Sequence, residues 1–262
     1  MALGTARMSD WILLRGLTRE ARHWGVLPGV LQTSAGIGPV TMLDLPGNGV
    51  EVAGRAPSGV PAMVAFLRER AARQGLARPY RLLAMSLGAM VAAEWAQRHP
   101  EEIGALVLVN TSMRPFCSVA ERLPPRNWPA LLGMALCWHN APYCERIVYR
   151  LTCNASAAIE TDVAAWRAIR GSAPVSRANA LRQLWAAARY HAPRTPPACP
   201  TLVLSSAADH LVDPVCSAHL AQAWGAQHRR HPWAGHDLPH DDPAWLAATV
   251  ARWLAAPGQR QR

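Results

Sequence analysis

Short apolar segments alternate with segments of helical spacing along most of this 262-residue chain. We predict strands at residues 11–14, 40–43, 80–84, 103–109 and 201–204. The spacing of apolar residues predicts helices over 61–74 and 243–254. Strands that are apolar at nearly every position fit a sheet buried on both faces, and their alternation with helices favours parallel pairing. The chain is therefore expected to form an α/β fold.

The strand pattern stops between Pro115 and Pro197. This stretch instead predicts helices, over 128–139, 144–151, 163–169 and 178–190. We therefore divide the chain into a core domain, residues 1–114 and 198–262, and a helical lid subdomain, residues 115–197. The lid contains four tryptophans, Trp128, Trp138, Trp166 and Trp185. Most of them are expected to pack against the core, and one or two are expected to face a pocket.

Composition limits the class of protein. Half of the residues are hydrophobic and 17% are charged, which suits one large core. Disorder is expected only at the ends, such as residues 257–262. No apolar run approaches the roughly 18 residues of a membrane span, and the run at 11–14 is too short for a signal peptide. We expect a soluble, cytoplasmic protein without a membrane span.

The net charge of +10 comes from arginine, since the chain has no lysine. A basic surface attracts nucleic acid, anionic lipid or an acidic carrier protein. Because the arginines are scattered and no recognition motif accompanies them, nucleic acid is not expected as a partner. The six cysteines form no C-x-x-C pair and are expected to be reduced and mostly buried. No zinc-ligand spacing is present, so neither a metal nor a cofactor is expected.

A serine follows the third predicted strand and precedes an alanine-rich helix. Residues 84–88 read Ala-Met-Ser-Leu-Gly, which is the pattern G-x-S-x-G with alanine in place of the first glycine. A serine in such a bend projects its hydroxyl toward free N–H groups of the helix, where negative charge is favoured. Ser86 is therefore a candidate nucleophile; the alternative is an ordinary helix N-cap.

Two later residues have the right contexts for a catalytic acid and base. Asp209 comes shortly after the strand at 201–204, and His236 follows a glycine in a loop before the last helix. Asp213 remains an alternative acid, and His231 and His240 remain alternative bases.

With these residues the chain resembles the α/β-hydrolase superfamily over almost its whole length. The order of Ser86, Asp209 and His236 is the order found in that superfamily. Residues 43–49, Leu-Asp-Leu-Pro-Gly-Asn-Gly, resemble its D-x-P-G-x-G loop, and residues 110–112, Asn-Thr-Ser, fit the segment that opens the lid. The size and the lid position most resemble the serine carboxylesterase group, which includes pimeloyl-carrier-protein methyl esterases.

The resemblance implies a mostly parallel sheet with helices on both faces, a helical lid and hydrolysis of carboxylic esters or thioesters. Ser86 would attack, His236 would transfer its proton, and Asp209 would orient the imidazole. The backbone N–H groups of Leu17 and Leu87 would form the oxyanion hole. The substrate would be a small-molecule ester, and an acidic acyl-carrier protein is a candidate partner for lid arginines, namely Arg122, Arg126, Arg146 and Arg150.

The chain departs from the family pattern at Arg15, which stands where the family has a histidine before the glycine. Arg15 is expected to brace a neighbouring loop rather than to take part in catalysis. Asp44 and Asp237 are expected to be structural. Two other functions remain open: cleavage of a different bond by the same triad, as in C–C hydrolases and perhydrolases, and non-catalytic binding of a small ligand.

Overall fold

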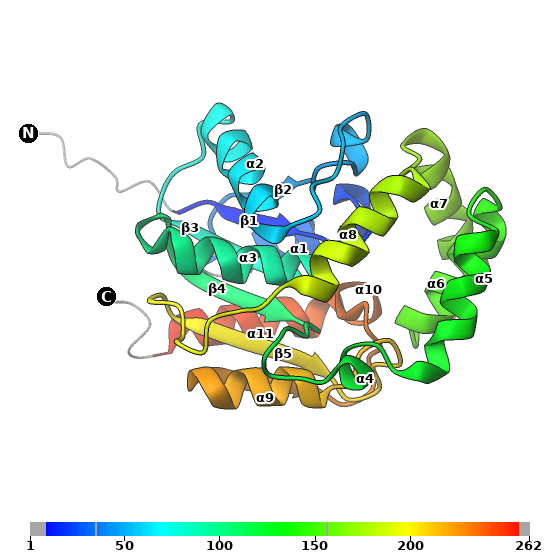
Figure 1. The fold of residues 1–262 in the computed structure, drawn as a ribbon. Helices are drawn as coiled ribbons and strands as arrows, with labels where there is room; N and C mark the ends of the chain where they lie inside the picture. Colours follow the sequence, from blue (N-terminus) through cyan, green and yellow to red (C-terminus); the bar gives the residue numbers. More distant parts are fainter. Residues whose placement is uncertain (1–8, 35, 156, 257–262) are drawn as a thin grey trace, which may run out of the picture.

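A computed structural model describes residues 9–34, 36–155 and 157–256. The disorder expected for residues 257–262 therefore lies outside the described residues. The centre of the described fold is a six-stranded sheet in the order β2-β1-β3-β4-β5-β6, with every neighbouring pair parallel (Figure 1). The strands are β1 (Trp11–Leu14), β2 (Val40–Leu43), β3 (Tyr80–Met85), β4 (Ile103–Val109), β5 (Thr201–Ser206) and β6 (Gln227–His231).

Helices cover both faces of the sheet, as the sequence predicts. One face packs against α2 (Val60–Arg73), α3 (Leu87–Arg98) and α9 (Val215–Trp224). The other packs against α1 (Leu27–Gln32) and α11 (Pro243–Ala255), with α10 (Leu238–Asp241) beside α11 (Figure 1). Along β1, Ile12 and Leu14 face the first group while Trp11 and Leu13 face the second. This alternation follows from the two-residue period of a strand.

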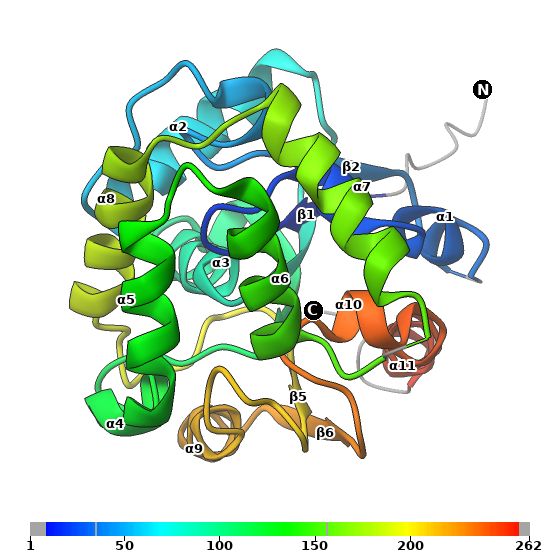
Figure 2. The same cartoon turned by 90° about the vertical axis from the view of Figure 1, so that its right-hand side faces the viewer.

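The segment between β4 and β5 contributes α4 (Val119–Arg122), α5 (Trp128–Leu136), α6 (Ala141–Thr152), α7 (Ile159–Ser172) and α8 (Arg177–Arg189). Helices α5, α6 and α7 lie beyond the carboxyl ends of the strands (Figures 1 and 2). This arrangement supports our division into core and lid, which we retain as a proposal. Among the described residues, no helix is both long and apolar enough to cross a bilayer.

Only two of the four lid tryptophans are buried. Trp138 and Trp166 are buried, but Trp128 and Trp185 are 51% and 54% exposed. Trp128 is exposed because α5 packs too lightly to bury any of its residues. Trp185 lines a cleft beside α8, as expected for one or two of the four, and the Arg189 guanidinium lies 5.3 Å from its ring centroid.

The cysteines are all free thiols, but only half of them are buried. Cys144, Cys153 and Cys216 are buried, whereas Cys137 is exposed and Cys117 and Cys199 are partly exposed. The expectation of mostly buried thiols is therefore wrong for three positions. Cys137 directly follows α5, a helix that buries none of its residues.

One buried carboxylate joins α2 and α3 to the turn before β4. Glu102 is 1% exposed and accepts two hydrogen bonds from Arg68, at 2.9 and 2.8 Å, and one from Trp95 Nε1 at 2.7 Å. These donors, Arg68 first, lower the pKa of Glu102 from 4.5 to about 2. Since a depressed pKa stabilises the folded state only while the carboxylate is ionised, this contribution is present above the unfolded value and is lost as the pH falls toward 2.

We expect Glu102→Gln to lower the free energy of unfolding at pH 7 by about 2 kcal/mol. Urea unfolding of both proteins at pH 7 and at pH 3.5 measures the effect, and the difference between them should be smaller at the lower pH. An equal difference at both pH values would contradict the ionic role of Glu102.

Candidate active site

Ser86 alone connects β3 to α3, because β3 ends at Met85 and α3 begins at Leu87. Its backbone has φ 53° and ψ −123°, in the region that side chains rarely adopt. Hydrogen bonds to its main chain fix this strained residue: its N–H donates to Val109 O at 3.0 Å, and its carbonyl accepts Thr111 Oγ1 at 3.1 Å as well as two N–H groups of the first turn of α3. Ser86 is the N-cap residue of α3 by position, but its side chain makes no capping hydrogen bond to the helix. Strain that is held in this way is typical of functional positions.

Glycines allow the first turn of α3 to approach the end of β1. A Cβ on Gly88 would lie 2.5 Å from the carbonyl oxygens of Leu14 and Arg15, and one on Gly16 would lie 3.0 Å from Ser86 Cβ. The segment that follows β1 is therefore held directly against Ser86. This is the placement that backbone N–H groups of Leu17 and Leu87 need if they are to share one oxyanion.

Asp209 and His236 come together across 27 residues of sequence. His236 Nδ1 donates to Asp209 Oδ2 at 2.7 Å, and both side chains are buried. The other carboxylate oxygen accepts backbone N–H groups of Leu211 at 2.8 Å and Val212 at 2.9 Å. Because Nδ1 is held by Asp209, Nε2 is the ring nitrogen that remains for a substrate or a nucleophile.

The alternative acid and bases have structural partners instead. Asp213 accepts the Val215 N–H at 3.0 Å, at the start of α9. His231 accepts the Ala234 N–H at 2.9 Å and lies 3.2 Å from Asp242, and His240 lies 3.2 Å from Asp162. These contacts favour Asp209 and His236 as the acid and base.

Asn110 is a site residue whose role the sequence interpretation missed. It lies just beyond β4 with φ 44°, and its Nδ2 donates to the His236 carbonyl at 2.7 Å and to Ser206 Oγ at 2.9 Å. Its Oδ1 accepts the Ser206 N–H at 2.8 Å. Asn110 thus joins the ends of β4 and β5 to the loop that carries His236. A buried amide directly after a central apolar strand is the signal that points to it.

Ser86 and His236 line one cavity of about 110 Å³. Its walls are mostly apolar and come from both the core and the segment between β4 and β5: Leu17, Met85, Leu131, Met134, Val148, Leu151 and Leu211. Arg15, Arg19 and Asp237 also reach it. Apolar walls with a few polar groups are typical of sites that bind a small apolar molecule such as an acyl chain.

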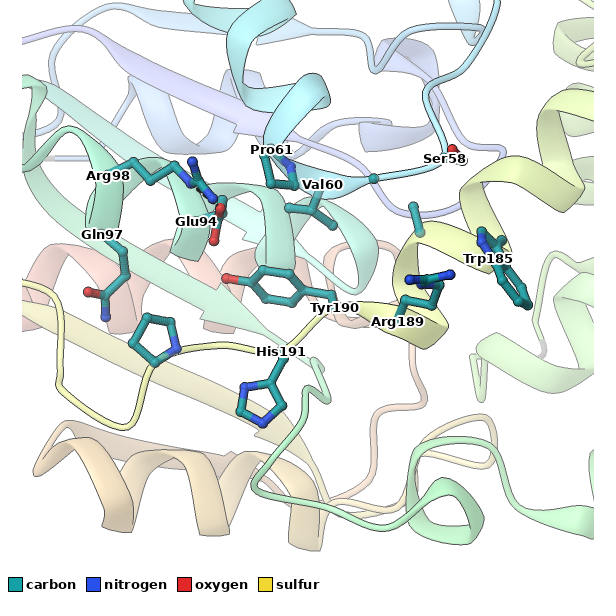
Figure 3. A pocket seen from close by; sticks show the side chains of 13 residues that line it. Ser58, Val60, Pro61, Glu94, Gln97, Arg98, Trp185, Arg189, Tyr190 and His191 are labelled. Atoms are coloured by element: carbon teal, nitrogen blue, oxygen red, sulfur yellow. Dashed lines mark hydrogen bonds and ion pairs between the residues drawn. The ribbon is translucent and has the colours of Figure 1, made fainter.

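A larger cleft of about 750 Å³ lies between α2, α3 and α8 (Figure 3). Glu94, Arg98, Arg189 and Tyr190 contribute to its lining. Ser86, Asp209 and His236 are not among its lining residues. We therefore place the candidate active site in the smaller cavity, because Ser86 and His236 line it and Asp209 is hydrogen-bonded to His236.

Arg15 and Asp237 form a buried ion pair next to His236. Arg15 Nη1 and Nη2 donate to the two oxygens of Asp237 at 2.9 and 2.5 Å, and each side chain is almost completely buried. Burial opposes ionisation of Asp237, but Arg15 outweighs it and the pKa of Asp237 is lowered. The guanidinium also lies 4.9 Å from the centroid of the Trp24 ring. The contact has the form expected of a brace between two loops.

Asp44 is also structural, as expected. Its carboxylate accepts the N–H of Ala21 at 2.7 Å and of Val50 at 2.9 Å, which closes the loop after β2. Burial raises the pKa of Asp44, although these two N–H groups lower it in part.

Two of the four lid arginines already have hydrogen-bond partners within the chain. Arg122 donates to the carbonyls of Ala187 and Ala188, and Arg146 forms a bidentate pair with Glu160 at 2.7 and 2.8 Å. Arg126 and Arg150 are exposed. An acidic partner of the lid would therefore meet the last two more directly than the first two.

Comparisons with known proteins identify the family of this fold. A family model described as the alpha/beta hydrolase fold matches residues 38–243. A pimeloyl-acyl-carrier-protein methyl ester esterase from Chromobacterium violaceum is 34% identical over 108 residues, which are 40% of this chain and 38% of that protein. The chain thus matches well under half the length of this curated relative.

Solved structures share the fold at low sequence identity. An enol-lactonase from Burkholderia xenovorans is 19% identical, with a TM-score of 0.77 over 95% of this chain and 92% of that one. A thermophilic esterase from Thermogutta terrifontis is 20% identical, with a TM-score of 0.72 over 94% and 89%.

Proposed function

The chain belongs to the α/β-hydrolase family, and on that premise we propose that it is a cytoplasmic serine hydrolase of carboxylic esters. The observation that supports this most is the 2.7 Å hydrogen bond between His236 and Asp209 beside a cavity that Ser86 also lines. In this proposal His236 takes the proton of Ser86 as the hydroxyl attacks the ester carbonyl, and returns it to the leaving alcohol. Water then repeats the cycle on the acyl-enzyme.

The developing oxyanion is assigned to the backbone N–H groups of Leu17 and Leu87. The close packing of Gly16 and Gly88 around Ser86 supports this assignment. Each such donor contributes about 3 kcal/mol to stabilising a transition state of this kind.

The small apolar cavity supports acyl groups of short to medium length. We expect Leu131→Trp, which fills the cavity from α5, to lower kcat/KM for p-nitrophenyl octanoate at least about 10-fold while the acetate ester is little affected. The matched control is Leu132→Trp, because Leu132 is the next residue on α5 but is 63% exposed. Steady-state rates on esters of increasing length test the proposal; equal losses from both variants would contradict the placement of the acyl chain.

An acyl-carrier protein is our candidate for the group that presents the ester. The partial similarity to an esterase named for such a substrate and the net charge of +10 support it. Since acidic partners are attracted by exposed cations, activity on an acyl-carrier methyl ester should fall about 10-fold or more between 50 and 500 mM salt. The free methyl ester should show no such loss.

Exposed arginines provide the control for the carrier proposal. Arg126→Gln/Arg150→Gln should raise the KM for the carrier substrate, whereas Arg229→Gln/Arg230→Gln, which removes two exposed charges from β6, should not. Equal effects of the two double variants would leave only a general effect of charge and would contradict a carrier site on the lid.

A further inference from the structure

The Arg15–Asp237 pair occupies an unusual position between the two halves of the candidate site. Arg15 directly follows β1 and is two residues before Leu17, whose N–H we assign to the oxyanion. Asp237 directly follows His236. One bidentate contact, at 2.9 and 2.5 Å, therefore fixes the oxyanion segment and the histidine loop relative to each other. Planar bidentate pairs restrict orientation as well as distance.

The Arg15–Asp237 pair also sets the net charge next to the His236 imidazole. During the reaction His236 becomes an imidazolium, and Asp209 already supplies one carboxylate at 2.7 Å. Asp237 is a second buried carboxylate on the adjacent residue. Without a compensating cation, two carboxylates would stabilise the imidazolium before the reaction begins, and an imidazole that is already protonated cannot accept the Ser86 proton. The Arg15 guanidinium cancels the second charge.

Other charged or titratable groups near this pair come from several elements. They are Arg19 and His23 from the segment after β1, Cys153 after α6, and His240 and Asp241 of α10. Arg19 is itself paired with Glu145 of α6 at 2.6 Å, and Asp241 accepts the Gly235 N–H at 2.7 Å. Arg15 is therefore the only cation among these groups that forms a direct ion pair with Asp237 in the described part of the chain.

We propose that Arg15 is a positioning residue for ester hydrolysis: paired with Asp237, it aligns the oxyanion segment with the histidine loop and keeps the charge beside His236 neutral. This role rests on the proposed function, because it acts through Ser86 chemistry. It explains why an arginine stands at a position where the family pattern has a histidine.

Three variants separate alignment from charge: Asp237→Asn, Arg15→Gln and the double variant Arg15→Gln/Asp237→Asn. Asp237→Asn keeps the size of the side chain and leaves Arg15 uncompensated, so the acidic limb of the kcat/KM–pH profile should move about one unit to lower pH. In the double variant both charges are gone, and the limb should return close to its wild-type position. Arg15→Gln and the double variant should both lower kcat about 10-fold or more while KM changes less than about 3-fold.

The control is Arg68→Gln, which breaks a bidentate pair with Glu102. Glu102 directly precedes β4, whereas His236 is bound by Asn110 at the other end of this strand. The control variant should lower stability and leave both kcat and the acidic limb unchanged. Circular dichroism checks that each variant is folded. If Arg15→Gln does not fold, Asp237→Asn alone still tests the charge.

The pH dependence should be measured twice, with a p-nitrophenyl ester and with a fluorophosphonate that reacts covalently at an activated serine. An unmoved acidic limb in Asp237→Asn, with an active wild type, would overturn the role of Arg15 alone. A wild-type chain that is inert to both reagents would instead overturn the proposed function and this role together.

Discussion

Replacing Ser86 by alanine is expected to lower kcat on p-nitrophenyl esters about 10⁵-fold, down to the rate that binding alone supports. The hydroxyl is the only group lost, because Ser86 makes no capping hydrogen bond to α3. The strained backbone at φ 53° is held by Val109 and Thr111, whose contacts involve the Ser86 main chain and not its side chain. The variant should therefore keep its fold, which a thermal melt can check.

The matched control is Ser58→Ala. Ser58 lines the larger cleft of Figure 3, away from the three candidate residues, and its loss should leave kcat unchanged. Ester hydrolysis that persists in Ser86→Ala would contradict the assignment of the nucleophile, whatever the effect at Ser58.

Asp209→Asn is expected to have the second largest effect, a loss of about 10⁴-fold in kcat. An amide at this position can present its NH₂ to His236 Nδ1 and select the wrong tautomer, so that Nε2 no longer accepts the serine proton. The 2.7 Å contact shows how closely the ring depends on this one acceptor. Steady-state kinetics at pH 8 measure the loss, with little change expected in KM.

Asp213→Asn is the comparison that discriminates between the two aspartates after β5. Asp213 holds the first turn of α9 through the Val215 N–H, so its replacement should cost some stability and change kcat less than about 3-fold. The opposite result, with Asp213→Asn the more damaging variant, would transfer the role of the acid to Asp213.

The central strands were predictable because their residues are apolar at almost every position. The central strands β1 and β4 have the predicted bounds, since a parallel strand covered on both faces needs apolar side chains on both. The edge strand β2 also has its predicted bounds, although only Leu43 of its residues is buried. Edge strand β6 was missed. Its residues, Gln227–His231, include two arginines and two histidines, and what makes it a strand is its pairing with β5 rather than its own sequence.

The lid was predictable as a set of helices but not in its packing. Apolar spacing located α5 to α8, whereas the exposure of Trp128 and Trp185 depends on how far each helix stands from its neighbours. These distances depend on tertiary packing, and the spacing of apolar residues within one helix does not predict them.

The candidate site also contains residues that the sequence predicts and residues that it does not. Ser86, Asp209 and His236 were recognisable because each sits in a local pattern of chain order, turn and glycine. Asn110 and the Arg15–Asp237 pair lack such patterns. Arg15 and Asp237 are separated by 222 residues, and their contact arises only when the parallel sheet brings the end of β1 near the histidine loop.

Reaction with a fluorophosphonate, followed by mass spectrometry of the trypsin-digested protein, tests the central claim most directly. The account predicts a single adduct on Ser86, in the peptide 82–98 that lies between Arg81 and Arg98, and none in Ser86→Ala. An adduct on another residue, or a wild-type protein that remains unlabelled while a control serine esterase reacts, would contradict it.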